Sequence, residues 1–257
     1  MRFTPVQRIG RGLFYVITVV AFVWSVQTID MIPEFLADAP AQTADLFTRM
    51  WPIDWAYWNK AAREGLVETL HTATLGTLIA LVLSVPVALL AARNVTKSVA
   101  LNFVAKLVLV SSRSVNSLIW ALLFVAIFGP GPLAGTLAIA FRSVGFIGKL
   151  LAEALEEAQP GPIEALTAAG APGLSVLTKA FWPQIEPSFW SVALFRWDIN
   201  VRESAVLGLV GAGGIGVALE AAMSNLYWDQ VGLCLLVIFG VVIATEVITS
   251  LVRSRII

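Results

Sequence analysis

One apolar stretch of the sequence, residues 189–210, contains an unusual number of polar and charged side chains. They are Arg196, Asp198, Asn200, Arg202, Glu203 and Ser204. Charged groups inside a membrane segment are costly and usually line a cavity or pair with one another. The guanidinium of Arg202 matches two oxygens of an oxyanion, and Asn200 and Ser204 would add neutral hydrogen bonds. The stretch therefore indicates recognition of an oxyanion along a pathway rather than covalent catalysis.

The same residues allow a second interpretation, in which the charges only pair with one another. Arg202 would pair with Asp198 or Glu203, and Arg196 with Asp198 or Asn200. For Arg202 both interpretations stay open. For Arg196, and for Arg142 in the preceding apolar stretch, we expect internal pairing.

A second polar group, Arg113 with Asn116, lies at the start of another apolar stretch. Both residues are candidates for the pathway or for a gate. Arg113 follows Arg93, Lys97 and Lys106 with no acidic residue between them. It would therefore serve equally well as a basic anchor on the cytoplasmic side of the membrane.

The composition identifies the class of protein. Of 257 residues, 58% are hydrophobic and 13% are charged, and the mean hydropathy is +0.83. Soluble domains carry about 25% charged residues, so we expect an α-helical protein that crosses a membrane several times. The formal net charge is zero, which gives no general attraction to nucleic acid.

Several kinds of site find no support in the sequence. His71 and Cys234 are the only residues of their types, so neither a zinc or haem motif nor an internal disulfide is available. The nearest match to an ATP-binding P-loop, residues 145–150, has the wrong spacing and ends in leucine. A membrane enzyme would need paired carboxylates, a histidine cluster or an activated serine. We expect no metal, no cofactor and no ATP site in this chain.

Apolar stretches define the expected architecture. We expect an all-α polytopic membrane protein with about six transmembrane helices, at 13–29, 65–92, 114–128, 133–150, 189–210 and 227–251. Residues 97–112 are basic and apolar in turn, and either lie along the membrane surface or begin the third span. The first helix is expected to be retained rather than removed as a signal peptide.

Two parts of the chain are expected. Residues 1–64 form a transmembrane helix and an external segment, whose tryptophans suit the membrane interface. Residues 65–257 form the main membrane domain, with a polar loop at 152–187. Both termini and the segment after the second span are basic, whereas residues 30–64 are net acidic. The positive-inside rule then places both termini and the polar loop in the cytoplasm.

The sequence of the polar loop predicts two short helices. Gly170 is expected to end the first and Pro183 the second. The loop resembles the EAA loop of bacterial ABC-importer permeases, with Leu166 in place of an alanine. The matching residues are Glu164, Ala165, Gly170 and Pro183. The resemblance implies that the loop docks into a groove on a separate ATPase subunit.

A glycine run follows the polar stretch and matches the dinucleotide-binding pattern G-x-G-x-x-G. Its glycines are Gly211, Gly213, Gly214 and Gly216. A Rossmann site needs a βαβ unit, so we expect instead a flexible, tightly packed break between the fifth and sixth spans. The run from Asn200 to Gly216 resembles the permease subunits of phosphonate and phosphate ABC importers, the PhnE-like family. This resemblance covers most of residues 65–257.

The resemblance implies a type I ABC-importer permease of the MetI-like fold, embedded in the lipid of a bacterial inner membrane. It further implies a homodimer, two ABC subunits that bind ATP and Mg²⁺, and an extracytoplasmic phosphonate- or phosphate-binding protein. The chain would then translocate an oxyanion by alternating access. The alternative is an ion-gradient-driven secondary transporter or channel for small anions, which would often show an internal repeat that this sequence lacks.

Overall fold

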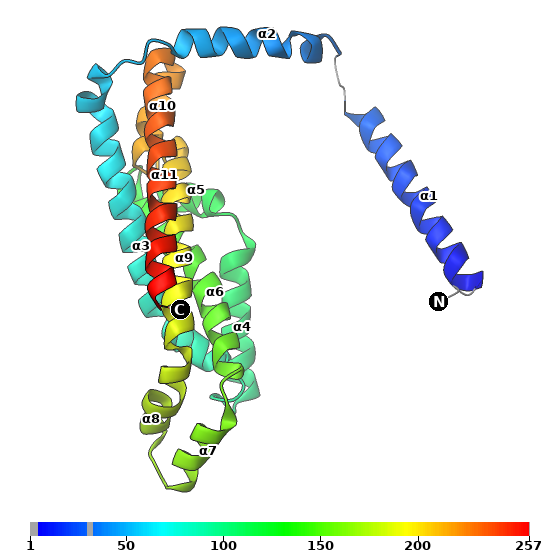
Figure 1. The fold of residues 1–257 in the computed structure, drawn as a ribbon, viewed down its shortest axis with the longest axis vertical. Helices are drawn as coiled ribbons and strands as arrows, with labels where there is room; N and C mark the ends of the chain where they lie inside the picture. The colour runs from blue at the N-terminus through cyan, green and yellow to red at the C-terminus, as the bar shows by residue number, and fades with distance from the viewer. Residues whose placement is uncertain (1–4, 30–32, 257) are drawn as a thin grey trace. The chain divides into compact units, whose positions relative to one another are not determined.

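The computed structural model describes residues 5–29 and 33–256, which are helical apart from short connections (Figure 1). Residues 1–4 of the basic N-terminus and residues 30–32 of the acidic segment lie outside the described residues. By its packing the chain divides into two compact units, Met1–Arg49 and Met50–Ile257.

The first unit contains α1 (Pro5–Thr28) and nearly all of α2 (Pro33–Met50). With 24 residues α1 is about 36 Å long, which is enough to cross a hydrocarbon core of about 30 Å. Its surface from Gly10 onward is exposed and largely apolar, as suits contact with lipid. α2 carries charges of both signs, among them an ion pair between Arg49 Nη2 and Asp45 Oδ2 at 2.8 Å.

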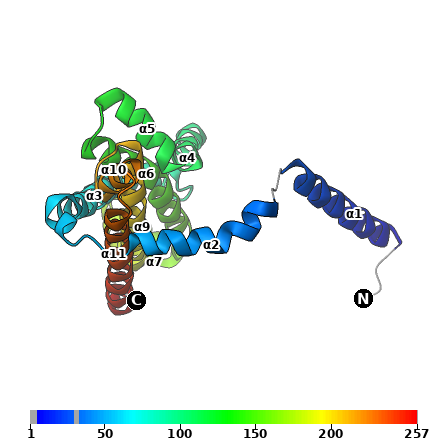
Figure 2. The same ribbon diagram turned by 90° about the horizontal axis from the view of Figure 1, so that it is seen from above.

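The second unit packs into one helical bundle. Its α-helices are α3 (Arg63–Ala91), α4 (Val99–Ser114), α5 (Ser117–Phe128), α6 (Pro132–Glu156), α7 (Pro160–Ala168), α8 (Gly173–Val176), α9 (Trp182–Leu207), α10 (Ile215–Ser224) and α11 (Trp228–Ile256). Two π-helical turns, η1 (Trp58–Ala62) and η2 (Leu177–Phe181), and one 3-10 turn, η3 (Gly208–Val210), lie between them. In Figure 1, α7 and α8 lie at one end of the bundle and α10 at the other. Figure 2 shows α4 and α5 on the opposite side of the bundle from α11.

The number of membrane spans agrees with the sequence. Within the described residues four continuous helices are long and apolar enough to cross a membrane: Gly10–Thr28, Trp58–Ala91, Pro132–Glu156 and Trp228–Arg255. Two bent helix pairs, α4 with α5 and α9 with α10, raise this number to six if each pair makes one span. The expectation of an all-helical membrane protein with about six spans is confirmed.

The third expected span, residues 114–128, is wrong in its position. α4 ends at Ser114 and α5 begins at Ser117, and the two helices meet at 92°. Asn116 interrupts the helix because its backbone is extended and its side chain accepts a hydrogen bond from Leu118 N at 3.0 Å. At about 18 Å, α5 is too short to cross a membrane alone. Most of the basic segment 97–112 therefore forms α4, the first helix of this bent pair.

Pro183 does not end a helix, contrary to the expectation. The π turn η2 widens the backbone just before it, with Trp182 N bonded to Leu177 O, and α9 begins at Trp182. Pro183 falls in the first turn of α9, where a missing N–H removes no helical hydrogen bond. A further helix, α10, follows the glycine run before the last span, and the sequence did not indicate it.

Small residues bring α3, α6 and α9 close together. Ala73 of α3 and Ala138 of α6 are fully buried. A methyl group added at Gly76 would lie only 2.7 Å from Ile139 Cγ2. In a membrane, close packing of small residues takes over much of the role that hydrophobic burial has in water. This packing holds α3 against α6, and α9 packs against both, so that the polar side chains of α6 and α9 face each other.

The packing boundary between the two units lies earlier than the expected division at 64/65. Tyr57 and Trp58 pack against a core that includes Ile215 and Leu233. The Tyr57 hydroxyl also donates to Ala218 O at 3.1 Å. By these contacts the aromatic segment just before α3 belongs to the bundle.

Candidate functional site

The polar residues of α9 fall on two faces of the helix. An α-helix turns about 100° per residue, so Arg196, Asn200 and Glu203 share one face. Asp198 and Arg202 lie on the opposite side. The first face meets α3 and α6, and the second meets α11, as the hydrogen bonds below show. The sequence cluster is therefore split into two separate networks.

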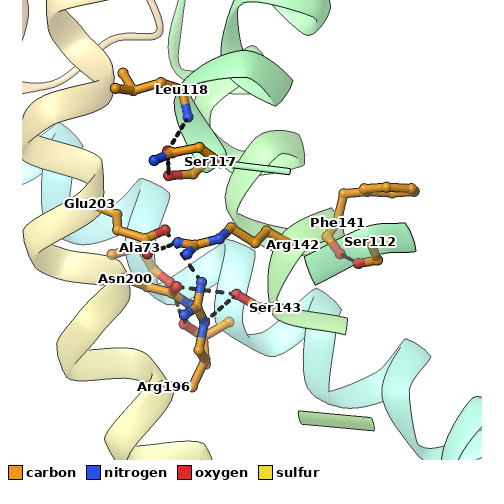
Figure 3. A network of polar contacts seen from close by, with 12 residues as sticks. Ala73, Ser112, Ser117, Leu118, Phe141, Arg142, Ser143, Arg196, Asn200 and Glu203 are labelled. Carbon is orange, nitrogen blue, oxygen red and sulfur yellow. Dashed lines mark hydrogen bonds and ion pairs between the residues drawn. The ribbon is translucent and has the colours of Figure 1, made fainter. Parts of the chain in front are cut away.

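Arg142 of α6 and Arg196 of α9 hold the two oxygens of one carboxylate, that of Glu203 (Figure 3). Arg142 Nη1 donates to Glu203 Oε1, and Arg196 Nη2 donates to Oε2 at 3.3 Å. The exposed fraction of the side chain is 3% for Arg196, 17% for Glu203 and 27% for Arg142. Arg142 lies about 15 Å along α6, near the middle of a membrane-spanning helix. Arg142, Arg196 and Glu203 are called the Glu203 cluster below.

Neutral side chains hold Arg196 in place (Figure 3). Its Nε donates to Ser143 Oγ at 2.9 Å, and Ser143 Oγ donates to Asn200 Oδ1 at 3.1 Å. Asn200 Nδ2 in turn donates to Thr77 Oγ1 of α3 at 2.8 Å. The guanidinium carbon lies 5.4 Å from the centre of the Phe146 ring, a favourable cation–π distance. Arg196 is thus held by α6 and α9, and α3 supports it through Asn200.

Arg202 belongs to the network on the side of α11. Its Nη2 lies 2.5 Å from Asp198 Oδ2 and 3.6 Å from Glu246 Oε2. Thr245 Oγ1 donates to Asp198 Oδ1 at 3.1 Å. The exposed fraction is 44% for the Arg202 side chain and 68% for that of Glu246. Because an exposed carboxylate within an apolar span is costly in lipid, this face requires water or another protein surface.

Two of the expected pathway residues point into the protein. Asn200 is 0% exposed and Ser204 is 2% exposed. Ser204 Oγ donates to Thr69 O of α3 at 3.2 Å. In this conformation both side chains bond within the chain, so a contact with an oxyanion would need α9 to move against α3.

Two further candidates for the pathway, Arg113 and Asn116, lie at the bend between α4 and α5 and are exposed. Asn116 Oδ1 accepts from Leu118 N at 3.0 Å and from Ser117 Oγ at 3.3 Å. The Asn116 Nδ2 group makes no hydrogen bond within the described residues. Arg113 lines a pocket of about 190 Å³. The charged residues of this pocket are Lys106, Arg113, Lys149, Glu153 and Glu156.

The glycine run forms the turn between α9 and α10. Gly211, Gly213 and Gly214 have φ values of +81°, +84° and +80°, a conformation that favours glycine. Thr69 Oγ1 of α3 accepts from Ile215 N at 2.9 Å and fixes the turn to the bundle. The turn is tightly packed, and its role as a hinge stays a prediction.

The closest approach in this turn is at Gly216. A methyl group there would overlap Ala205 O and lie 2.8 Å from Gly208 Cα. We expect Gly216→Ala to lower the free energy of unfolding by about 2 kcal/mol, because overpacking forces the backbone apart. Gly240→Ala is a matched control, since nothing lies within 4 Å of the added methyl group. Equal thermal midpoints of the two variants in detergent would contradict this packing.

α7 and α8 form an exposed helical hairpin beyond the end of α6 (Figure 1). Its exposed positions include Glu164, Ala165 and Gly170 of the expected docking motif, and the fourth motif residue, Pro183, is exposed at the start of α9. Gly170 has a φ of +75° where the chain turns between the two helices. Gln159 N donates to Gln184 Oε1 at 2.8 Å, and Ile163 packs against the core at this end of the bundle. The hairpin is therefore anchored at its base and free along its outer face.

The sequence analysis missed two acidic partners. Arg142 and Arg196 do pair within the chain, but their common partner Glu203 was considered only for Arg202. Glu246 was not singled out, although one acid within an apolar span is itself a signal of function. Within the described residues no three His, Cys, Asp or Glu side chains gather where they could hold a metal ion.

A comparison with models of protein families identifies the family to which the chain belongs. Residues 84–256 match the family described as binding-protein-dependent transport system inner membrane component. The chain belongs to this family. The matched range covers α4 to α11, and so contains the charged residues of both networks of α9 and the α7–α8 hairpin. The chain is accordingly a multi-pass membrane protein and a permease component.

Curated members of this permease family are similar to the chain over much of its length. The phosphite transport system permease protein PtxC of Stutzerimonas stutzeri is 40% identical over 212 residues, which are 82% of this chain and 77% of that protein. The phosphate-import permease protein PhnE of Mycolicibacterium smegmatis is 39% identical over 212 residues, 82% of this chain. The chain spans only 40% of the length of that relative.

Solved structures show which fold the permease family shares with this chain. The methionine transporter MetNI in an inward-facing conformation matches with a TM-score of 0.67 and 20% identity, over 80% of this chain and all of the other. An amino acid ABC transporter matches with a TM-score of 0.65 and 19% identity, over 79% and 99%. The chain therefore has the type I, MetI-like fold of ABC-importer permeases.

Proposed function

We propose that the chain is the membrane-spanning subunit of an ATP-driven importer that carries phosphate, phosphite or phosphonate into a bacterial cytoplasm by alternating access. The relatives are named for phosphate and phosphite, which are small oxyanions of phosphorus. The single observation that carries the importer function is the exposed α7–α8 hairpin. It presents Glu164 on an outer face that no other described residue covers.

The proposed partners would supply the second half of the pathway, the ATPase activity and the capture of the anion. A second copy would complete the pathway in a homodimer. Two ABC subunits would bind ATP and Mg²⁺ and would each hold one α7–α8 hairpin. An extracytoplasmic phosphate- or phosphonate-binding protein would deliver the anion and supply most of the selectivity. ATP hydrolysis would then lie wholly in the partner subunits.

The charge distribution supports a cytoplasmic position for the hairpin. Glu156, at the end of α6, accepts from Arg93 N at 3.0 Å, so the basic segment after α3 lies at this end of the bundle. Basic residues here are Arg93, Lys97, Lys106, Lys149, Lys179, Arg253 and Arg255. The positive-inside rule favours the cytoplasm for this end and for the C-terminus. We propose the same side for the N-terminus.

Co-purification tests this function. The tagged chain, isolated gently from its native host, should bring down an ABC ATPase. Its hydrolysis should rise when the extracytoplasmic binding protein is added with phosphate, phosphite or methylphosphonate. A chain that comes down alone and moves solute in vesicles without ATP would contradict the proposal and would favour a gradient-driven carrier.

A further inference from the structure

The Glu203 cluster contains more positive than negative charge. Two guanidiniums, those of Arg142 and Arg196, share the single carboxylate of Glu203. No other acidic side chain of the described residues forms an ion pair with either arginine. The nearest network of charges, around Asp198 and Arg202, lies on the opposite face of α9 and cannot neutralise the excess by contact. An unmatched cation at this depth in a membrane is costly unless it meets water or an anion.

The excess charge is accessible at Arg142. Arg196 is almost fully buried and uses its Nε on Ser143 and one of its two Nη groups on Glu203. Arg142 bonds Glu203 through Nη1 only, and 27% of its side chain is exposed. Its remaining N–H groups donate to no described residue. Since lipid would not solvate these donors, the exposed part of Arg142 faces an aqueous path or a second protein surface.

The bend before α5 adds donors on the same side. The Trp120 ring lies 4.4 Å from the Phe141 ring, so the first turn of α5 crosses α6 next to Arg142. The free Nδ2 group of Asn116 and the positive end of the α5 dipole belong to this turn. A charged fork and a neutral amide donor are the groups that a tetrahedral oxyanion needs.

We propose that Arg142 is the residue through which the pathway contacts the translocated phosphorus oxyanion at mid-membrane. The Arg196–Glu203 pair orients its guanidinium, and Asn116 supplies a second donor. This inference rests on the proposed function and names its contact residue. It also replaces Arg202, whose guanidinium already has two carboxylates near it.

Uptake by the complete complex, isolated with its ATPase and binding protein and placed in proteoliposomes, tests this inference. The probes are radiolabelled phosphate and methylphosphonate. Arg142→Gln should lower uptake between about tenfold and a hundredfold, the worth of one charged hydrogen-bonding group. Its thermal midpoint should not fall, because Arg196 and Glu203 remain as a balanced pair. Arg142→Lys keeps the charge without the fork and should retain part of the uptake.

Arg49→Gln, which alters an exposed ion pair of the first unit, is the matched control and should transport normally. Normal uptake by Arg142→Gln with loss in Arg202→Gln would overturn the inference and leave the importer function intact. Loss of uptake together with a lower thermal midpoint in Arg142→Gln would also overturn it, because that pair of results marks a structural ion pair. A wild-type complex that moves neither probe with ATP would instead reject the proposed function itself.

Discussion

Replacing Glu203 by glutamine is expected to cost more stability than any other single change of charge in the bundle. The substitution leaves the guanidiniums of Arg142 and Arg196 side by side without a counter-charge, and Arg196 is 3% exposed. Removing one partner of a buried ion pair typically costs about 3–5 kcal/mol. We expect about 3 kcal/mol here because Arg142 keeps some contact with solvent. Thermal unfolding of the purified chain in detergent measures the loss.

Two variants bracket this result. Glu246→Gln removes a carboxylate that is 68% exposed and 3.6 Å from Arg202, so we expect a loss below about 1 kcal/mol. Arg142→Gln removes the surplus cation and should not lower the midpoint. If Glu203→Gln proves as stable as Glu246→Gln, the two arginines do not depend on this carboxylate, and the Glu203 cluster does not stabilise the fold.

Reversing the charge at Glu164 is expected to uncouple ATP hydrolysis from transport. Glu164 is exposed on α7 and has no ion pair within the described residues, so Glu164→Lys should leave the chain folded and inserted. In the complete complex the substitution should place a cation on the face through which we propose that the ATPase docks. We expect substrate-stimulated hydrolysis to fall at least about tenfold, the effect of roughly 1.4 kcal/mol at an interface.

Glu157→Lys provides the control for this change. Glu157 is also exposed and lies at the end of α6, just before the hairpin. The substitution therefore changes the charge of the same region but outside α7. A complex that contains Glu157→Lys should hydrolyse ATP at the rate of the wild-type complex. Normal substrate-stimulated hydrolysis in Glu164→Lys would argue strongly against docking through this hairpin.

The long apolar helices were predictable because their signal is local. α3, α6 and α11 each follow a long, predominantly apolar run, and α3 contains Pro86 without ending there. The bend at Asn116 was not predictable from hydropathy, because one capping side chain competes with an apolar pattern that continues on both sides. Pro183 was misjudged for a related reason, since η2 allows proline to begin α9 instead of ending a helix.

In the candidate site too, contacts between residues close in sequence were predictable, and contacts between residues far apart in sequence were not. Arg202 and Asp198 are one helical turn apart, and their pairing could be read from the sequence as one of two options. Arg142 and Glu203 are separated by most of two helices and the hairpin, so their contact depends on how α6 packs against α9. Small residues such as Gly76, which packs α3 against α6, give no indication in the sequence of which helix they will meet.

ATP-dependent uptake by the reconstituted complex tests the central claim most directly. Proteoliposomes would contain the chain with its ATPase, receive the binding protein outside, and hold ATP and Mg²⁺ inside. The account predicts uptake of phosphate or methylphosphonate that requires internal ATP and persists when an ionophore collapses the membrane potential. Uptake that proceeds without ATP and stops with the ionophore would contradict it, and would make the chain a gradient-driven carrier.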